Sequence, residues 1–200
     1  IVMSTFHVYG ALQDNPAFIS EDYPLRASIR YPDLRDVVEM DQISTNWMWK
    51  HQKEIETIVF RPCNIIGPQI NNAISKYLRA SYSPIPLDFN PMMQFINEFD
   101  MAKIIIDSLE KVPTGVYNVA PDEVISLKKS RDIIGNPSLR VPLFMVEPLI
   151  RAASNRFLKI PDYLLDYIKF SCIIDNKELK SKIKPKFRFN VTETLQLLKS

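Results

Sequence analysis

Four side chains in the first third of this sequence are of types that can move a proton on or off an alcohol. Thr5 offers a hydroxyl, Tyr31 a phenol, Arg35 a cation four residues later, and Asn64 an amide. A phenol with a pKa of about 10 is a poor base at neutral pH, so it needs a nearby positive charge to favour the phenolate. In a helix, Arg35 would lie one turn after Tyr31 and could supply that charge. Such a pair, with a hydroxyl to hold the substrate oxygen, is suited to general acid–base catalysis of hydride transfer.

Hydrophobic patterning indicates which elements position these side chains. Residues 1–5 are expected to form a short core strand, followed by a turn near Gly10. Residues 31–53 are expected to be helical, with Pro32 in the first turn, and the β-branched segment 56–61 is expected to be a central strand. Because ligands sit at the carboxyl ends of parallel strands, Thr5, Tyr31 and Asn64 are expected to line one cleft there.

Further elements alternate along the chain. Residues 11–30, with two prolines and scattered acids, are expected to be a loop. Asp100 is expected to cap a helix over 101–111, and Ser126 a helix that Gly135 ends. A helix is also expected over 72–80, and strands over 94–96 and 115–120. Strands alternating with helices predict a mainly parallel sheet.

Composition excludes several classes of function. With 25 Lys and Arg against 23 Asp and Glu, the net charge of +2 does not indicate a nucleic-acid or anionic-membrane partner. No run of eighteen apolar residues predicts a membrane span. Cys63 and Cys172 fit no metal spacing, His7 and His51 are too few and too distant for a metal site, and His7 is expected to be packed or solvent-facing. A reduced, buried Cys63 favours a cytoplasmic location.

Three short motifs and two later segments resemble one family. The motifs are STFHVYG at 4–10, YPDLR at 31–35 and RPCNIIGP at 61–68, and the segments are QFINEFD at 94–100 and GVYNVA at 115–120. Together they are similar to the extended short-chain dehydrogenase/reductase family, the NAD-dependent epimerases and dehydratases of nucleotide sugars. The resemblance implies catalytic roles for Tyr31, Thr5 and Arg35. It also implies cofactor contacts by Tyr31, Arg35 and Pro62, and substrate contacts by Asn64 and Thr5.

The chain departs from this family at three points. It has four glycines and lacks the glycine-rich strand–turn–helix that seats the pyrophosphate of NAD. Arg35 stands where the family has lysine, and a planar guanidinium is a different hydrogen-bonding group from a compact ammonium. Met93 stands where many members place an arginine that binds diphosphate. Because Ile1 already lies in an apparent strand, we expect this chain to be part of a longer protein.

The resemblance predicts an α/β fold. Residues 1–141 are expected to form the remainder of a Rossmann-like domain, a partial parallel sheet with helices on both faces and substrate-loop insertions. Residues 142–200 are expected to form a small, mostly helical C-terminal substrate subdomain. A helix at 163–170 is amphipathic and reads first as part of that subdomain's core, with a partner or membrane helix as the other interpretation.

The function that follows is an NAD(P)-dependent epimerase, dehydratase or reductase acting on a sugar or nucleotide-sugar hydroxyl. NAD or NADP is implied as the cofactor, with no metal, and homodimer formation is left open. Two alternatives remain at this point. One is a catalytically weakened relative that binds a dinucleotide as a sensor or scaffold, and the other is a non-enzymatic interaction module.

Overall fold

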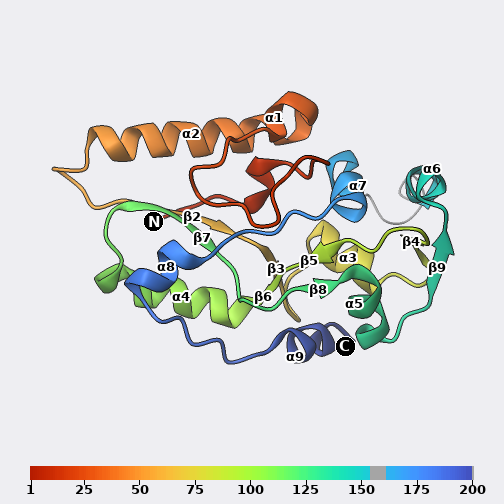
Figure 1. The fold of residues 1–200 in the computed structure, drawn as a ribbon. Coiled ribbons are helices and arrows are strands. Elements are labelled where there is room, and N and C mark those ends of the chain that lie inside the picture. The colour runs from red at the N-terminus through yellow and green to blue at the C-terminus, as the bar shows by residue number, and fades with distance from the viewer. Residues whose placement is uncertain (154–160, 200) are drawn as a thin grey trace.

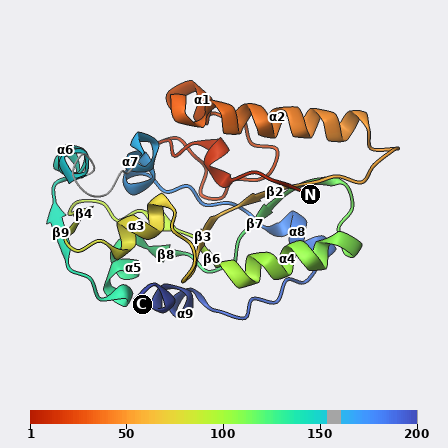
Figure 2. The same ribbon diagram turned by 180° about the vertical axis from the view of Figure 1, so that it is seen from behind.

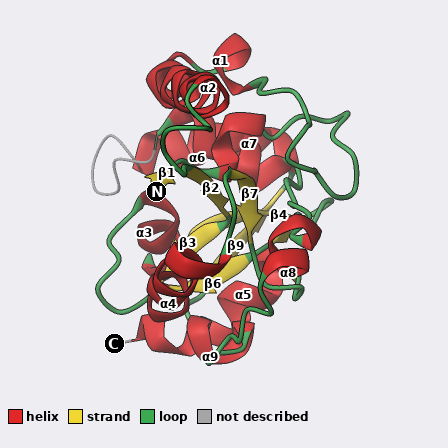
Figure 3. Cartoon of the chain, turned by 90° about the vertical axis from the view of Figure 1, so that its left-hand side faces the viewer, coloured by secondary structure: helices red, strands yellow, loops and turns green. Residues whose placement is uncertain are grey.

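A three-stranded parallel sheet lies at the centre of the computed structural model, which describes residues 1–153 and 161–199. Its strands are β1 (Val2–Met3), β2 (Ile58–Pro62) and β7 (Gly115–Val119), in the order β1–β2–β7. All five residues of β2 are buried, as expected of a parallel strand covered on both faces. Helix α2 (Arg35–Lys50) lies on one side of the sheet and α4 (Glu98–Lys111) on the other (Figures 1 and 3). The predicted α/β fold with a parallel sheet is confirmed.

Three two-stranded pairs extend this core. β3 (Asn64–Ile66) pairs with β6 (Phe95–Asn97), and β4 (Ser83–Pro86) with β9 (Ser138–Val141), both in parallel. β5 (Met92–Met93) pairs with β8 (Ile125–Ser126) in antiparallel. The sequence analysis predicted neither β4 nor β9. In β4, Pro84 and Pro86 argue against a strand, but a proline is tolerated where its missing N–H has no ladder partner.

The N-terminal strand is shorter than predicted. It ends at Met3, and a 3-10 helix over Phe6–Tyr9 follows. Thr5 is the N-cap of that helix, because its hydroxyl accepts the backbone N–H of His7. Gly10 ends it with φ of 80°, a left-handed value that favours glycine. The predicted loop over 11–30 also contains a single helical turn, α1 (Ala27–Arg30).

The predicted helix over 31–53 is also corrected at its start. Tyr31 is extended, with φ −118° and ψ 104°, because the residue before a proline is disfavoured in the helical region. A 3-10 turn over Pro32–Leu34 follows, and α2 begins only at Arg35. Tyr31 and Arg35 therefore do not lie on successive turns of one α-helix. The start of α4 is corrected too, since its N-cap is Asn97 rather than Asp100.

The remaining helices largely follow the prediction. Ser126 caps α5 (Leu127–Ile134) and Gly135 ends it with φ of 85°, as expected. The others are α3 (Ala73–Arg79), α6 (Leu143–Ala153), α7 (Asp162–Lys169), α8 (Lys177–Lys182) and α9 (Val191–Gln196), with a 3-10 turn over Leu197–Lys199. The predicted helical part, 142–200, is mostly helical where it is described; residues 154–160 and 200 lie outside the described residues.

Helix α7 packs on the segment that follows β1. The hydroxyl of Tyr167 donates to the backbone carbonyl of His7 at 2.9 Å, and both ribbon views place α7 beside this segment (Figures 1 and 2). The apolar face of α7, Leu164, Leu165 and Ile168, is buried. This favours the core interpretation of the amphipathic segment over a partner or membrane helix.

Candidate functional site

Thr5, Pro62 and Asn64 come together around one small cavity of about 170 Å³. Thr5 follows β1, Pro62 ends β2 and Asn64 begins β3, so all three lie at the carboxyl edge of the central sheet. We call this the Thr5 cavity. Its full lining is Ser4, Thr5, His7, Pro62, Cys63, Asn64, Ile65, Asn72, Ala73, Ile74, Tyr163 and Leu164. Of the predicted site residues, Tyr31 and Arg35 are absent from this lining.

The side chain of Asn64 is held by the backbone. Its amide nitrogen donates to the carbonyl of Gln94 at 3.1 Å, and the residue is buried. Gln94 is itself fixed by the C-terminal segment, because its side-chain oxygen accepts the N–H of Ile174 and its amide donates to the carbonyl of Ile174. Asn64 is thus a rigid part of the cavity wall.

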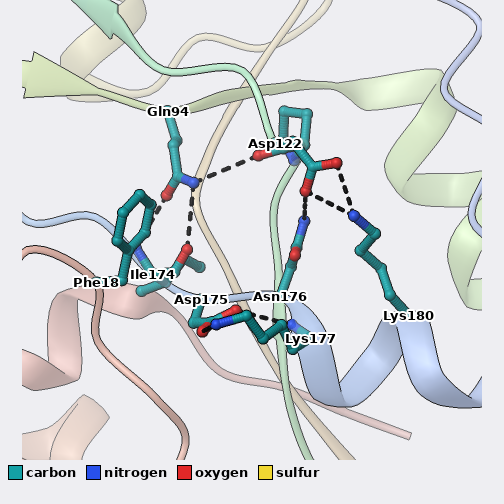
Figure 4. A pocket seen from close by; sticks show the side chains of 9 residues that line it. Phe18, Gln94, Asp122, Ile174, Asp175, Asn176, Lys177 and Lys180 are labelled. Atoms are coloured by element: carbon teal, nitrogen blue, oxygen red, sulfur yellow. Dashed lines mark hydrogen bonds and ion pairs between the residues drawn. The ribbon is translucent and has the colours of Figure 1, made fainter.

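Gln94 belongs to a second cavity, on the side of the C-terminal segment (Figure 4). There the Lys180 ammonium pairs with Asp122 at 2.7 Å, and Asn176 donates to Asp122 and to the carbonyl of Ala120. Among the described residues, none of the buried side-chain polar atoms of this cavity lacks a partner. These contacts attach the C-terminal segment to the sheet, and we assign the cavity a structural role.

Tyr31 lines a third cavity, of about 350 Å³, which shares Tyr163 with the Thr5 cavity. We call it the Tyr31 cavity. The Tyr31 hydroxyl donates to the Asp166 carboxylate at 2.6 Å, with the Ala11 carbonyl at 3.3 Å. Burial, and the hydrogen bond and charge of Asp166, raise the pKa of Tyr31 well above its usual value. The phenol is therefore held neutral, the opposite of what a catalytic base requires.

Arg30 is the cation in contact with this tyrosine. Its guanidinium lies 5.9 Å from the centre of the Tyr31 ring and forms an ion pair with Asp166 at 2.9 Å. Arg35 is exposed on α2, and its side chain makes no hydrogen bond or ion pair with any described residue. The structure thus separates Arg35 from the hydroxyl chemistry around Tyr31, and the role predicted for it stays a prediction.

The Tyr31 cavity is densely charged. Lys169 contacts Glu147 at 2.6 Å and lies 3.7 Å from Asp166, and Arg151 pairs with Glu147 at 3.0 Å. The contact with Lys169 lowers the pKa of Glu147. Asp166 is 8% exposed at its side chain, so its charge is strongly coupled to these cations. The negative and positive charges around this cavity therefore offset one another.

A buried polar network supports the strand end that carries Thr5. The Ser4 hydroxyl donates to Asp41 at 2.5 Å, and Arg61 contacts the same carboxylate through Nε at 2.9 Å and through Nη2 at 2.6 Å. Arg61 also donates to the Tyr9 hydroxyl at 3.0 Å. Sequence reasoning missed this network, although a charged residue inside the apolar strand IVFRP was a signal that a buried acid must pair with it.

Other reactive groups do not add a site. Cys63 and Cys172 are free and buried, and burial raises the pKa of both thiols. Across residues 1–153 and 161–199, no group of three His, Cys, Asp or Glu side chains is arranged to hold a metal ion. In the same residues, no helix has both the length and the apolar character needed to cross a bilayer.

Comparison with protein families and curated proteins gives distant matches. No family model matches the chain. Rv0501 of Mycobacterium tuberculosis (strain H37Rv) and Mb0513 of Mycobacterium bovis, both described as uncharacterized, are 21% identical to it over 185 residues. The match covers 92% of this chain and 49% of each relative, so the chain spans about half the length of the curated relatives it matches.

Solved structures match over nearly the whole chain. A dTDP-glucose 4,6-dehydratase from Bacillus anthracis in complex with NAD aligns with a TM-score of 0.66 and 17% identity, over 97% of this chain and 58% of its own. RMD from Pseudomonas aeruginosa complexed with NADPH aligns with a TM-score of 0.67 and 15% identity, over 98% of this chain and 63% of its own. UDP-glucose 4-epimerase from Thermotoga maritima with UDP-glucose aligns with a TM-score of 0.64 and 15% identity, over 98% of this chain and 60% of its own. The chain has the fold of these enzymes, which confirms the predicted resemblance at the level of fold.

Proposed function

We propose that the natural protein containing this chain is a relative of the nucleotide-sugar epimerases and dehydratases whose tyrosine-dependent hydride transfer is weakened. It would use NAD or NADP and bind a sugar-like molecule in the Thr5 cavity. The observation that carries the weakening is the 2.6 Å hydrogen bond from Tyr31 to Asp166. A phenol that donates to a carboxylate is stabilised in its protonated form and is a poor acceptor for a substrate proton.

Among the described residues, those predicted to contact the cofactor are not brought together in one cavity. Pro62 lines the Thr5 cavity, Tyr31 lines the Tyr31 cavity, and Arg35 lines neither. No glycine-rich turn is present to receive a pyrophosphate. A dinucleotide would therefore have to be anchored mainly by residues outside these 200.

A sugar-like ligand fits the chemistry of the Thr5 cavity. Its wall combines the Thr5 hydroxyl and the Asn64 amide with apolar side chains such as Ile74 and Leu164. A few fixed polar groups among apolar ones are typical of small-molecule sites. In the Tyr31 cavity, by contrast, charged side chains already pair with one another.

An active epimerase or dehydratase is the second candidate. Asp166 keeps an ion pair with Arg30 at 2.9 Å and has Lys169 at 3.7 Å, so it would remain compensated if Tyr31 turned away. Tyr31 would then be released next to the Arg30 guanidinium, which favours the phenolate. In this case the hydrogen bond from Tyr31 to Asp166 would belong to a resting state of the enzyme.

Enzyme assays on the full-length natural protein separate these candidates. The reduction of NAD⁺ and NADP⁺ would be followed with a panel of sugars and nucleotide sugars, for the parent, Asp166→Asn and Tyr31→Phe. The proposal expects slow turnover in the parent and a rise of about tenfold or more in Asp166→Asn, since one pKa unit corresponds to about 1.4 kcal/mol. Asp107→Asn, on α4 and in the lining of none of the three cavities described above, is the control and should leave turnover unchanged.

The outcomes differ clearly. Fast turnover in the parent that Tyr31→Phe abolishes would favour the active enzyme. Binding of a sugar-like ligand with no turnover in any variant would favour a sensor or scaffold. A protein that binds no member of the panel would contradict the proposal.

A further inference from the structure

His7 lines the Thr5 cavity and contacts its hydroxyl. The imidazole Nδ1 lies 2.8 Å from Thr5 Oγ1. The other ring nitrogen, Nε2, has no solvent-accessible surface and no hydrogen-bond partner among the described residues. The rings of Tyr163 and Tyr167 pack against the imidazole in T-shaped contacts, with centroids 5.3 and 4.7 Å away. The sequence analysis left His7 as a packed or solvent-facing residue; the residue is half-buried, with its ring packed against the two tyrosines.

The contacts of Thr5 permit a hydrogen bond in which its hydroxyl donates to His7. Thr5 Oγ1 already accepts the backbone N–H of His7 at 3.3 Å, as the N-cap of the 3-10 helix. A hydroxyl has one hydrogen to donate, and Nδ1 at 2.8 Å is in position to accept it. Nδ1 can accept only if the imidazole is neutral and carries its proton on Nε2.

The surroundings of the imidazole favour this form. Burial lowers the pKa of His7 to about 3, so the ring is neutral at physiological pH. An N–H at the edge of an imidazole is attracted to the face of an aromatic ring, whereas a lone pair is repelled by it. Tyr163 and Tyr167 both meet the imidazole in T-shaped contacts, an arrangement in which a proton on Nε2 can face an aromatic ring.

Thr5 then has one lone pair left for a ligand and no hydrogen. We propose that His7 is a positioning and specificity-determining residue, which takes the Thr5 hydroxyl hydrogen and thereby makes Thr5 an acceptor toward the cavity. A ligand group beside Thr5 must donate, so the cavity selects the alcohol form of a sugar-like molecule over the corresponding ketone. This rests on the proposed function, in which the Thr5 cavity binds such a molecule. The sequence analysis expected only that the Thr5 hydroxyl would hold a substrate oxygen, and His7 adds a direction to that contact.

The first test reads the histidine tautomer directly. The full-length natural protein would be labelled with ¹⁵N-histidine, and His7 would be assigned by the resonances lost in His7→Phe. We expect a neutral ring with the proton on Nε2 and a hydrogen-bonded Nδ1. Thr5→Val should shift the Nδ1 resonance toward that of an unbonded acceptor, and Thr5→Ser should restore it. A proton on Nδ1 in the parent would overturn the proposal.

The second test measures the selectivity that follows. The probes are tetrahydropyran-4-ol, a sugar-like ring with a single hydroxyl, and tetrahydropyran-4-one, the ketone formed by oxidising it, with binding measured by calorimetry or chemical-shift titration. We expect the parent to bind the alcohol about tenfold more tightly, the cost of one unsatisfied hydrogen bond. His7→Phe keeps an aromatic ring in place but frees the Thr5 hydrogen, so the preference should fall to within about twofold. His51→Phe, at the end of α2, is the control and should keep the preference.

The outcomes distinguish this inference from the function on which it rests. Equal binding of the two probes by the parent, or a preference that His7→Phe leaves intact, would overturn the role of His7 alone. Failure of the parent to bind either probe would count against the Thr5 cavity as a sugar-like site, and so against both.

Discussion

The Thr5 cavity and the Tyr31 cavity share Tyr163 but have opposite chemical characters. The first is small and uncharged, and its polar groups are fixed by backbone contacts and by a neutral histidine. The second is lined by seven charged side chains, Arg30, Asp33, Glu147, Arg151, Asp162, Asp166 and Lys169. The family-like motifs supply Thr5, Asn64 and Tyr31, but the partners that decide their chemistry are His7 and Asp166. Motif spacing therefore locates reactive groups without fixing their protonation.

Breaking the buried network that supports the Thr5 cavity should have the largest effect on the free energy of unfolding. Asp41→Ala leaves Arg61 as a buried charge and removes the acceptor of Ser4. Loss of one partner of a buried ion pair costs about 3–5 kcal/mol of unfolding free energy. Chemical denaturation would measure it. Asp107→Ala breaks the exposed pair with Lys103 and, as the control, should cost less than about 1 kcal/mol. A loss of similar size in both variants would contradict the stabilising role assigned to the buried pair of Asp41 and Arg61.

Of the two cavities, the Thr5 cavity should also make the free energy of unfolding sensitive to acid, through His7. His7 has a pKa of about 3 when folded and about 6.5 when unfolded, so between these values only the unfolded chain gains the proton. The free energy of unfolding should therefore fall as pH falls below 6.5, by about 1.4 kcal/mol per pH unit from this residue.

The check is the pH dependence of unfolding in the parent, His7→Phe and His51→Phe. The His7 variant should lose this part of the slope while the His51 variant keeps it. Parallel curves for the parent and His7→Phe between pH 6.5 and 4 would show that His7 titrates normally.

A smaller difference in unfolding free energy is expected between variants of Arg30 and Arg35, the two arginines close to Tyr31 in the sequence. Arg30→Met removes a half-exposed partner of Asp166 and should cost about 1 kcal/mol of unfolding free energy. Arg35→Met should remain within about 0.5 kcal/mol, as is usual for an exposed residue without side-chain partners. Thermal or urea unfolding of both variants measures the difference. If Arg35→Met were the more damaging change, the placement of Arg35 away from the Tyr31 cavity would be wrong.

The sequence predicted the parts of this arrangement that follow from local rules. The parallel sheet, the caps at Ser126 and Gly135, and the location of Thr5 and Asn64 just past the carboxyl ends of β1 and β2 follow from patterning and turn chemistry. The interruption after Tyr31 was not predicted, although the sequence contains its signal, since Pro32 disfavours a helical Tyr31.

What the sequence did not predict depends on long-range contacts. Asp166 lies 135 residues from Tyr31, and no local rule connects them. His7 is only two residues from Thr5, but its contact depends on a 3-10 turn inside a segment expected to be a strand and turn. The network of Ser4, Asp41 and Arg61 is of the same kind, because it joins a strand end, a helix and a second strand.

The state of the Tyr31 hydroxyl tests the central claim most directly. In the full-length natural protein with tyrosine labelled at the ring Cζ, ¹³C NMR would follow ionisation against pH, with Tyr31 assigned by the resonance missing in Tyr31→Phe. At pH 10, where an ordinary tyrosine is about half ionised, Tyr31 should remain protonated, and Asp166→Asn should lower its midpoint. A Tyr31 that is half ionised at or below pH 10 in the parent would contradict the account and restore it as a candidate catalytic base.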